Sequence, residues 1–369
     1  MLITNAELAD GRTADVRVSG ESVAAVGDLD PGDGEDVLDA GGKLLLPGMI
    51  DVHVHFREPG YPEKETWTSG SHSAAAGGVT TVVDQPNTDP PTVTGEAFDA
   101  KAELAVPSCV DYGLNGGVTP DWDPDSLFDR PLFALGEVFL ADSTGNMGIE
   151  ADLFESALRR ATDEGVTVTV HAEDADLFDE SARDRGDEDY DAWSAYRTPE
   201  AELAAVERAC AVAEDVGARI HVAHASTPEG VDAAADAGMS TEVTPHHLLL
   251  SRADLDELGT FGRMNPPLRS EERRRALYDR VADGTVDVVA TDHAPHTRAE
   301  KDTDVWSAPS GVPGVETALP LLLAAADRGE LTYERVRDLT AATPADVFGL
   351  DRKGRIEEGN DADLVLVGT

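Results

Sequence analysis

The chain has 369 residues, 41% of them hydrophobic, which suits one large α/β core with a small accessory unit. Asp and Glu number 73 against 29 Lys and Arg, and the net charge of −44 would repel nucleic-acid phosphates, so no nucleic-acid partner is expected. The longest apolar run, residues 318–326, is far shorter than the roughly 18–20 residues of a membrane span, so no membrane partner is expected either.

Short alternating β patterns come first along the chain. They cover residues 16–18, 23–26 and 37–38, separated by Gly and Asp turns, and a similar pattern returns at residues 354–368. We therefore predict that both chain ends, residues 1–48 and 352–369, form one accessory β domain.

Between these ends, β-branched runs alternate with alanine-rich amphipathic stretches. The expected strands are residues 49–56, 80–85, 110–116, 132–140, 166–172, 219–225, 240–245 and 286–291. Expected helices include residues 71–76, 149–164, 200–216, 228–237 and 270–283, and some open on a threonine cap followed by proline, as at Thr198-Pro199. Eight strands alternating with helices predict an α/β fold, a parallel (β/α)8 barrel of the TIM type over residues 49–351.

Polar side chains end several of the expected barrel strands. His53 and His55 stand two apart on the first strand and so share a face, but such a pair alone is more often structural or solvated than a metal site. Similar positions on four other strands carry Glu137, His171, His224 and Asp292. A carboxylate in an apolar run, such as Glu137, needs either an internal salt bridge or a bound cation. Because catalytic groups gather at the carboxyl ends of barrel strands, we expect the six to converge.

Nitrogen and oxygen donors without thiolate suit Zn²⁺, with Mn²⁺ or Co²⁺ as substitutes. Six ligands exceed what one catalytic zinc takes, so the pattern predicts two metal ions sharing a carboxylate, for which Glu137 is the natural bridge. Such a pair, ~3.5–4 Å apart, lowers the pKa of bound water to about 7 and so activates hydroxide. Asp292 could bind one ion through one oxygen and move a proton with the other.

At these residues the sequence resembles the amidohydrolase superfamily and, within it, the dihydroorotases of bacterial and archaeal type. The resemblance covers nearly the whole chain. Its motifs are PGMIDVHVHFREPG at residues 47–60, DQPNTDPP at 84–91, NPPLR at 265–269 and TDHAPH at 291–296. It implies the reversible conversion of N-carbamoyl-L-aspartate to L-dihydroorotate, a step of pyrimidine biosynthesis, with a small molecule as the substrate.

The resemblance also implies residue roles. One zinc would take His53, His55 and Asp292, the other His171 and His224, and Glu137 would bind both, with Asp292 as the catalytic acid and base. Substrate contacts would come from His55, Arg57, Asn87, Asn265, His296 and the backbone of Ser310 and Gly311. The sequence departs from many relatives at Glu137, where a carboxylated lysine is common. It also departs after Thr369, where relatives supply further strands to the accessory domain.

Two other functions stay open. An allantoinase or hydantoinase is the nearer one, although such relatives tend to lack the residues equivalent to Arg57 and Asn87. A barrel that has lost catalysis and serves as a scaffold is the more distant one. Of the remaining histidines, His221 is expected on the outer face of its strand, three residues from His224. His246 and His247 are expected to be structural, with orientation of a ligand as the alternative.

The composition also bears on the cellular setting. Two cysteines, Cys109 and Cys210, are too few for a disulfide framework, and the first residues lack a secretory signal, so a cytoplasmic location is expected. Self-repulsion at a charge of −44 is relieved by concentrated salt, which suggests a salt-adapted cytoplasm. Together with the resemblance to dihydroorotases of bacterial and archaeal type, this implies a halophilic archaeal source. A homo-oligomer is compatible with the sequence, which fixes neither the native metal nor the oligomeric state.

Overall fold

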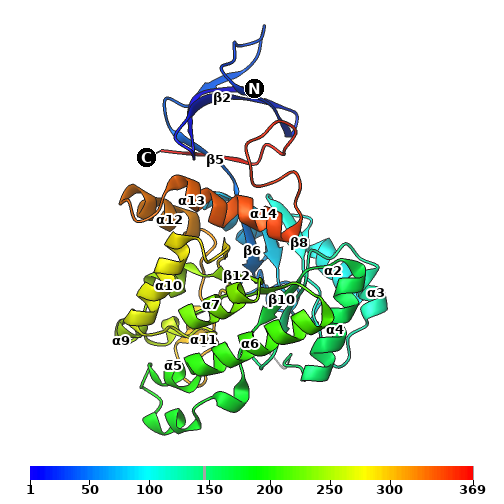
Figure 1. Ribbon diagram of the computed structural model, residues 1–369, viewed down its shortest axis with the longest axis vertical. Helices are drawn as coiled ribbons and strands as arrows, with labels where there is room; N and C mark the ends of the chain where they lie inside the picture. Colours follow the sequence, from blue (N-terminus) through cyan, green and yellow to red (C-terminus); the bar gives the residue numbers. More distant parts are fainter. Residues whose placement is uncertain (144–146, 369) are drawn as a thin grey trace.

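The computed structural model describes residues 1–143 and 147–368, and it places both chain ends in one small sheet beside a barrel (Figure 1). The small sheet has six strands in the order β14-β5-β1-β2-β3, with β4 paired to β1. Its strands are β1 Leu2–Leu8, β2 Thr13–Ser19, β3 Ser22–Gly27, β4 Val37–Asp39, β5 Leu44–Pro47 and β14 Leu364–Val367.

The alternating patterns identified four of these strands but not β1 and β5. All four residues of β5 are buried, so this strand has no polar face and shows no alternation. It lies between β1 and β14 and runs antiparallel to β14, which joins the two ends of the chain. The division of the chain at residues 48 and 352 stays a prediction, although β5 ends at Pro47 and the next strand begins at Met49.

Eight parallel strands form the barrel. They are β6 Met49–Val54, β7 Val79–Asp84, β8 Asp111–Leu114, β9 Leu135–Phe139, β10 Val168–His171, β11 Ile220–Val222, β12 Ser240–Val243 and β13 Val288–Val289. Five of them pair in the order β13-β12-β11-β10-β9 and three in the order β6-β7-β8. Parallel bridges from Gly116 to Leu135 and from Val54 to His293 join the two sheets and close the barrel, which confirms the predicted fold class.

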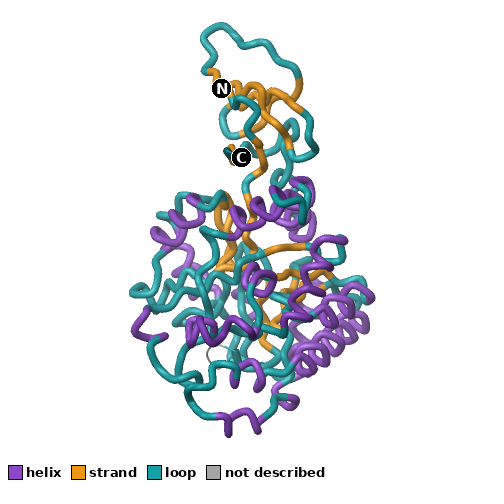
Figure 2. Tube along the Cα trace, turned by 90° about the vertical axis from the view of Figure 1, so that its left-hand side faces the viewer, coloured by secondary structure: helices purple, strands orange, loops and turns teal. Residues whose placement is uncertain are grey.

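Helices surround the barrel strands (Figure 2). They are α1 Trp67–Ala76, α2 Gly95–Ala105, α3 Pro124–Phe128, α4 Ala151–Glu164, α5 Ala192–Tyr196, α6 Pro199–Val216, α7 Pro228–Asp236, α8 Pro245–Leu249, α9 Leu255–Leu258, α10 Glu271–Asp283, α11 Arg298–Lys301, α12 Ala318–Asp327, α13 Tyr333–Arg337 and α14 Thr343–Phe348. Short 3-10 turns lie at Ala175–Leu177, Glu180–Arg185, Arg252–Asp254 and Gly259–Gly262, and a π-helical turn lies at Asp338–Ala342.

Caps explain where the helices begin. Thr198 and Thr227 accept hydrogen bonds from the first turns of α6 and α7, and a proline follows each of them, as the sequence predicted. Helix α1 begins at Trp67, earlier than the predicted residue 71, because Thr66 and Ser69 form a capping box.

One end of the barrel is filled by apolar side chains. Ile50, Val52 and Val288 pack with Ala345 and Phe348 of α14, and Figure 1 shows α14 between the barrel and the small sheet. The strands terminate at their carboxyl ends at the other end of the barrel, where the catalytic groups of such barrels gather. Within residues 1–143 and 147–368, no helix combines the length and apolar character that crossing a membrane requires.

Candidate metal centre

Glu137 of β9 lies at the centre of the predicted ligand set. Its Oε1 is 2.8 Å from Nδ1 of His171 and 2.5 Å from Nε2 of His224, while its Oε2 is 3.4 Å from Nε2 of His53. His171 belongs to β10, His224 follows β11 and His53 belongs to β6. The two oxygens of one carboxylate thus face histidines from opposite sides of the barrel.

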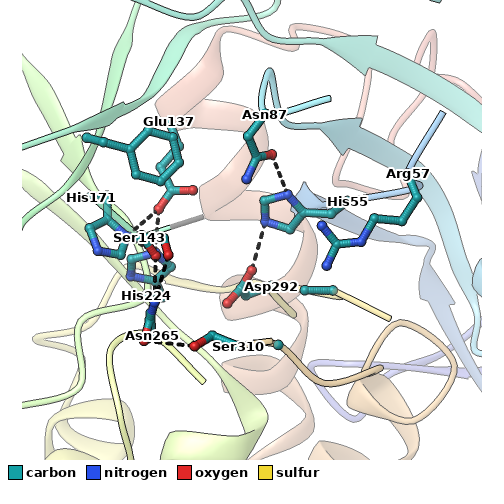
Figure 3. Close-up of a pocket in the computed structure, with 13 residues that line it drawn as sticks. His55, Arg57, Asn87, Glu137, Ser143, His171, His224, Asn265, Asp292 and Ser310 are labelled. Carbon is teal, nitrogen blue, oxygen red and sulfur yellow. Dashed lines mark hydrogen bonds and ion pairs between the residues drawn. The ribbon is translucent and has the colours of Figure 1, made fainter. Parts of the chain in front are cut away.

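Asp292 completes the set from the end of β13. Its Oδ1 is 2.9 Å from Nε2 of His55 and 3.6 Å from Nε2 of His53. Figure 3 shows His55 and Asp292 together, with Glu137, His171 and His224 beside them. The fold therefore brings all six predicted donors into one cluster, although up to about 240 residues separate them along the chain.

The donors fit divalent cations. Nε2 of His53 is buried without a hydrogen-bond partner, and it faces oxygens of Glu137 and Asp292 at 3.4 and 3.6 Å. Ligand atoms on a tetrahedral zinc lie roughly 3.3 Å apart, given Zn–N bonds of about 2.0–2.1 Å. Two buried trios have ligand atoms within 4.8 Å of one another, namely His53 with Glu137 and His224, and His53 with His55 and Asp292. His53 belongs to both trios.

The charge states agree with a cation site. Burial opposes ionisation of Glu137, but His224 and His53 outweigh it and hold the pKa of this carboxyl well below its usual range. Asp292 is similar, since its contacts with His55 and the nearby His53 overcome burial and lower its pKa to about 2. Both carboxylates are therefore anionic near neutral pH, as metal ligands must be.

Unusual backbone conformations aim the site residues. Four non-glycine residues of the described chain have positive φ, and three of them are Arg57 at 64°, His224 at 34° and Asp292 at 46°. Residues in this region are rare and concentrate at functional sites. Each lies just beyond the end of a barrel strand, where a left-handed residue redirects the side chain that regular alternation would place elsewhere.

The prediction for His221 is wrong for this reason. His221 was expected on the outer face because three residues separate it from His224. It is buried inside the barrel instead, where its Nε2 is 3.2 Å from Oε2 of Glu242 and its ring contacts Phe348. The positive φ of His224 breaks the alternation, so both histidines face inward.

Two carboxylates behind the ligands were missed. Oε1 of Glu242 on β12 is 2.5 Å from Nδ1 of His53, and Oε2 of Glu173 is 2.8 Å from Nε2 of His171. Both are buried. The signal that identified Glu137, a carboxylate within or just after an expected barrel strand, also applied to them.

The predicted substrate residues surround one pocket beside this cluster. His55, Arg57, Asn87, Asn265, Ser310 and Gly311 line it together with Glu137, His171, His224 and Asp292. His296 is not among the lining residues. Its buried side chain lies behind Arg57, with Nε2 2.9 Å from the carbonyl oxygen of Ser310 and 3.2 Å from Nη2 of Arg57.

Arg57 carries a positive charge into the pocket. Its Nε donates to the carbonyl of Pro295, and among the described residues no carboxylate lies within ion-pair distance of the guanidinium. Figure 3 shows it across the pocket from Glu137, with His55 between them. A buried cation without a partner is costly, so the site favours an anionic ligand.

The rim of the pocket is held by Asn265. Its side-chain amide donates to Oγ of Ser143 at 2.9 Å, and its Oδ1 accepts from Ser310 Oγ at 3.2 Å and from Nε1 of Trp193 at 3.0 Å. Ser143 and Trp193 were not predicted here, and Trp193 was assigned to packing alone. Because the three contacts join segments 122, 72 and 45 residues from Asn265, no local pattern reveals them.

Comparisons with known proteins agree with this geometry. Residues 44–369 match the Amidohydrolase family. The chain is 70% identical over 368 residues to a dihydroorotase of Halobacterium salinarum. This alignment covers 99% of this chain and 86% of the relative. It is 43% identical to a dihydroorotase of Methanosarcina acetivorans, covering 96% of this chain and 80% of the relative. Among solved structures, the L-hydantoinase (dihydropyrimidinase) of Arthrobacter aurescens has a TM-score of 0.94 at 30% identity, covering 99% of this chain and 86% of that one.

Proposed function

The chain belongs to the amidohydrolase family, and we propose that it acts as a dihydroorotase, interconverting L-dihydroorotate and N-carbamoyl-L-aspartate in pyrimidine biosynthesis. The observation that carries the proposal is the unpaired guanidinium of Arg57 in the pocket that the six donors share. Dihydroorotate combines a cyclic amide with a carboxylate, and a guanidinium binds a carboxylate through two parallel hydrogen bonds. The relative from Halobacterium salinarum is also consistent with the expected halophilic archaeal source.

We assign the metal ligands as the resemblance implies, with His53, His55 and Asp292 on one ion, His171 and His224 on the other, and Glu137 on both. The contacts of Glu137 with histidines on both of its oxygens support the bridging role. Donors of nitrogen and oxygen favour Zn²⁺, and Mn²⁺ or Co²⁺ would also be accepted. Bound, the two ions would supply an activated water and a Lewis acid for the amide carbonyl.

Asp292 is the proposed proton carrier. In the hydrolytic direction a water oxygen bonds to the amide carbon, the ring C–N bond breaks, and Asp292 passes the proton of the water to the departing nitrogen. Cyclisation runs through the same transfers in reverse. Oδ1 of Asp292 is engaged by His55, whereas Oδ2 has no hydrogen-bond partner in the described part of the chain and can hold the proton.

The remaining pocket residues orient the reactants. Asn87 Oδ1 lies 2.7 Å from Nδ1 of His55 and accepts its proton, which leaves Nε2 free to bind a cation. Asn265, Ser310 and Gly311 also line the pocket, where they would close over the edge of the substrate ring. His296 does not line the pocket, and its contacts with Arg57 and with the carbonyl oxygen of Ser310 hold these two groups in place.

The rival activities fit this pocket less well. Hydantoin and allantoin carry no carboxylate, so neither would neutralise Arg57. The likeness to hydantoinase structures extends over the whole fold, but it comes with 30% identity, compared with 70% to a dihydroorotase. A scaffold without catalysis is not supported, because every position at which the resemblance implies a metal ligand carries a histidine, glutamate or aspartate.

The test is a turnover assay on purified protein in molar KCl with added Zn²⁺. We expect the protein to interconvert dihydroorotate and N-carbamoyl-L-aspartate. The reaction is monitored by chromatography in both directions. Turnover of hydantoin or allantoin without dihydroorotate would reject the proposal. Metal quantification on the same sample measures the ion content. A cytoplasmic location and a homo-oligomeric state stay predictions.

A further inference from the structure

Glu242 touches a candidate ligand of each metal position. Its Oε1 lies 2.5 Å from Nδ1 of His53 and accepts the main-chain N–H of His224 at 3.1 Å. Its Oε2 lies 3.2 Å from Nε2 of His221. One carboxylate therefore contacts the ring of a ligand assigned to the first ion and the backbone of a ligand assigned to the second.

The contact to His224 involves an unusual backbone. His224 has a φ of 34°, a conformation that costs a non-glycine residue roughly 1–3 kcal/mol, so the surrounding structure must hold it. The hydrogen bond from its N–H to Glu242 is one of the contacts that do so. On the imidazole of His53, a carboxylate at Nδ1 places the proton there and leaves the Nε2 lone pair facing Glu137 and Asp292.

The charge of Glu242 lacks a fixed counterion. The corresponding residue behind His171, Glu173, pairs with Arg197 at 2.6 Å. Among the described residues, no lysine or arginine forms an ion pair with Glu242, which is 1% exposed and has only histidines as basic neighbours. A buried carboxylate of this kind is stable only if a positive charge lies close by. A cation on His53 would supply it.

We propose that Glu242 is a positioning residue of the metal centre, which aligns His53 and His224 together and contributes the negative charge that favours an ion at His53. The proposal deepens the proposed function and rests on the metal centre described there. Glu242 does not touch the substrate pocket, since it is not among the lining residues. Its removal therefore acts through the metals, with substrate contacts left intact.

Two substitutions separate charge from geometry. Glu242→Gln keeps an oxygen for His53 and His224 and turns its amide toward Nε2 of His221, so it removes only the charge. Glu242→Ala removes the contacts as well. The matched control is Glu202→Gln, another buried carboxylate, which hydrogen bonds Ser226 and Thr227, pairs with Arg269, and in the described structure makes no hydrogen bond or ion pair with any of the six donors. Thermal melting of each metal-free variant establishes that it is folded.

The measurement is Zn²⁺ affinity by competition with a chelator in molar KCl, together with the visible absorption of Co²⁺-loaded protein. We expect Glu242→Gln to weaken Zn²⁺ binding about 10-fold and Glu242→Ala about 100-fold. The Co²⁺ spectrum of the alanine variant should change, because the ligand geometry is loosened. Activity should fall in kcat with KM for dihydroorotate unchanged. Glu202→Gln should keep the affinity and spectrum of the unsubstituted protein.

Unchanged Zn²⁺ affinity in folded Glu242→Gln overturns the proposal, as does equal weakening in Glu242→Gln and Glu202→Gln. If Glu242→Ala fails to fold, the glutamine variant alone decides. The two hypotheses fail separately. Zn²⁺ binding that depends on Glu242, in a protein that hydrolyses hydantoin instead of dihydroorotate, refutes only the proposed function. Dihydroorotate turnover with Zn²⁺ affinity independent of Glu242 refutes only this inference.

Discussion

Oε1 of Gln85 accepts the main-chain N–H of Glu137 at 2.9 Å, so the residue at the centre of the cluster is tied to the end of β7, two strands away in the barrel wall. Oε1 of Gln85 also accepts a hydrogen bond from the side-chain amide of Asn115 at 3.1 Å. The side-chain amide of Gln85 donates to the carbonyl oxygen of Val52 at 3.1 Å. One buried amide therefore links β6, the segment after β8, and β9 at the level of the metal centre.

Gln85→Leu should destabilise the protein and disturb the metal centre together. The substitution leaves the N–H of Glu137, the amide of Asn115 and the carbonyl of Val52 without this partner, and each buried unsatisfied group costs about 1–3 kcal/mol. We expect a loss of several kcal/mol in urea unfolding of the metal-free protein, and weaker Zn²⁺ binding. A variant as stable as the parent would show that water replaces the amide.

Glu137→Ala tests the bridging role directly. Without the shared carboxylate, at least one of the two ions should be lost, and activity should fall by roughly 10³-fold or more because hydroxide activation depends on the pair. Elemental analysis of the dialysed protein gives the stoichiometry. Retention of both ions in the alanine variant would exclude Glu137 as the bridge.

Arg57→Ala should weaken substrate binding without affecting the metals. Truncating one partner of a buried charge pair costs about 2–5 kcal/mol, so KM for dihydroorotate should rise by roughly 30-fold or more. Metal content should stay at the parent value, because the Arg57 side chain contacts Pro295 and His296 and none of the six donors. Simultaneous loss of metal would show that Arg57 supports the cluster instead.

His247 makes the fold sensitive to acid. Burial lowers the pKa of His247 to about 3, and the ring bonds Thr244 and the carbonyl of Pro266. Between pH ~6.5 and 3 the unfolded chain binds a proton here that the folded chain does not. Stability is therefore lost as the pH falls through this window, by up to about 1.4 kcal/mol per pH unit.

His247→Gln removes this titration, and glutamine can still hydrogen bond in the same place. Urea unfolding of the metal-free protein at pH 7, 6 and 5 should show a shallower decline for the variant than for the parent. Metal-free samples are needed so that ligand protonation contributes equally to both. Parallel declines would mean that His247 is not the responsible group.

Salt should stabilise the protein strongly, and one cluster offers a local test. Nζ of Lys353 lies 2.5 Å from Asp111 at the start of β8 and 2.5 Å from Asp363 next to β14, so it links the barrel to the small sheet. Lys353→Met leaves Asp111 and Asp363 without this cation, whereas Asp361 near them keeps its ion pair with Arg352. We expect a loss of about 1 kcal/mol in low salt that shrinks in molar KCl, where charges are screened.

The midpoint of thermal unfolding, measured from 0.2 to 3 M KCl, checks both expectations. The parent midpoint should rise with salt because a net charge of −44 repels itself. The difference between parent and Lys353→Met should narrow over the same range. A difference independent of salt would assign Lys353 a packing role.

The sequence by itself determined the barrel and the six donors of the candidate centre. β-branched runs, amphipathic stretches and helix caps are local signals, and they identified all eight barrel strands and placed His53, Glu137, His171 and Asp292 at corresponding depths. Parallel strands in a barrel then bring their carboxyl ends together whatever their separation in sequence. Convergence of the donors therefore followed from topology alone.

Only the tertiary structure decided how the donors are aimed and what holds them. Alternation applies while the backbone stays in the β region, and it fails at His224, whose positive φ turns its own side chain into the interior that His221 also faces. Glu242 reaches His53 across 189 residues, and Trp193 reaches Asn265 across 72. Such contacts depend on side-chain directions at strand ends and between distant loops, which are set by packing in three dimensions and leave no periodic trace in the chain.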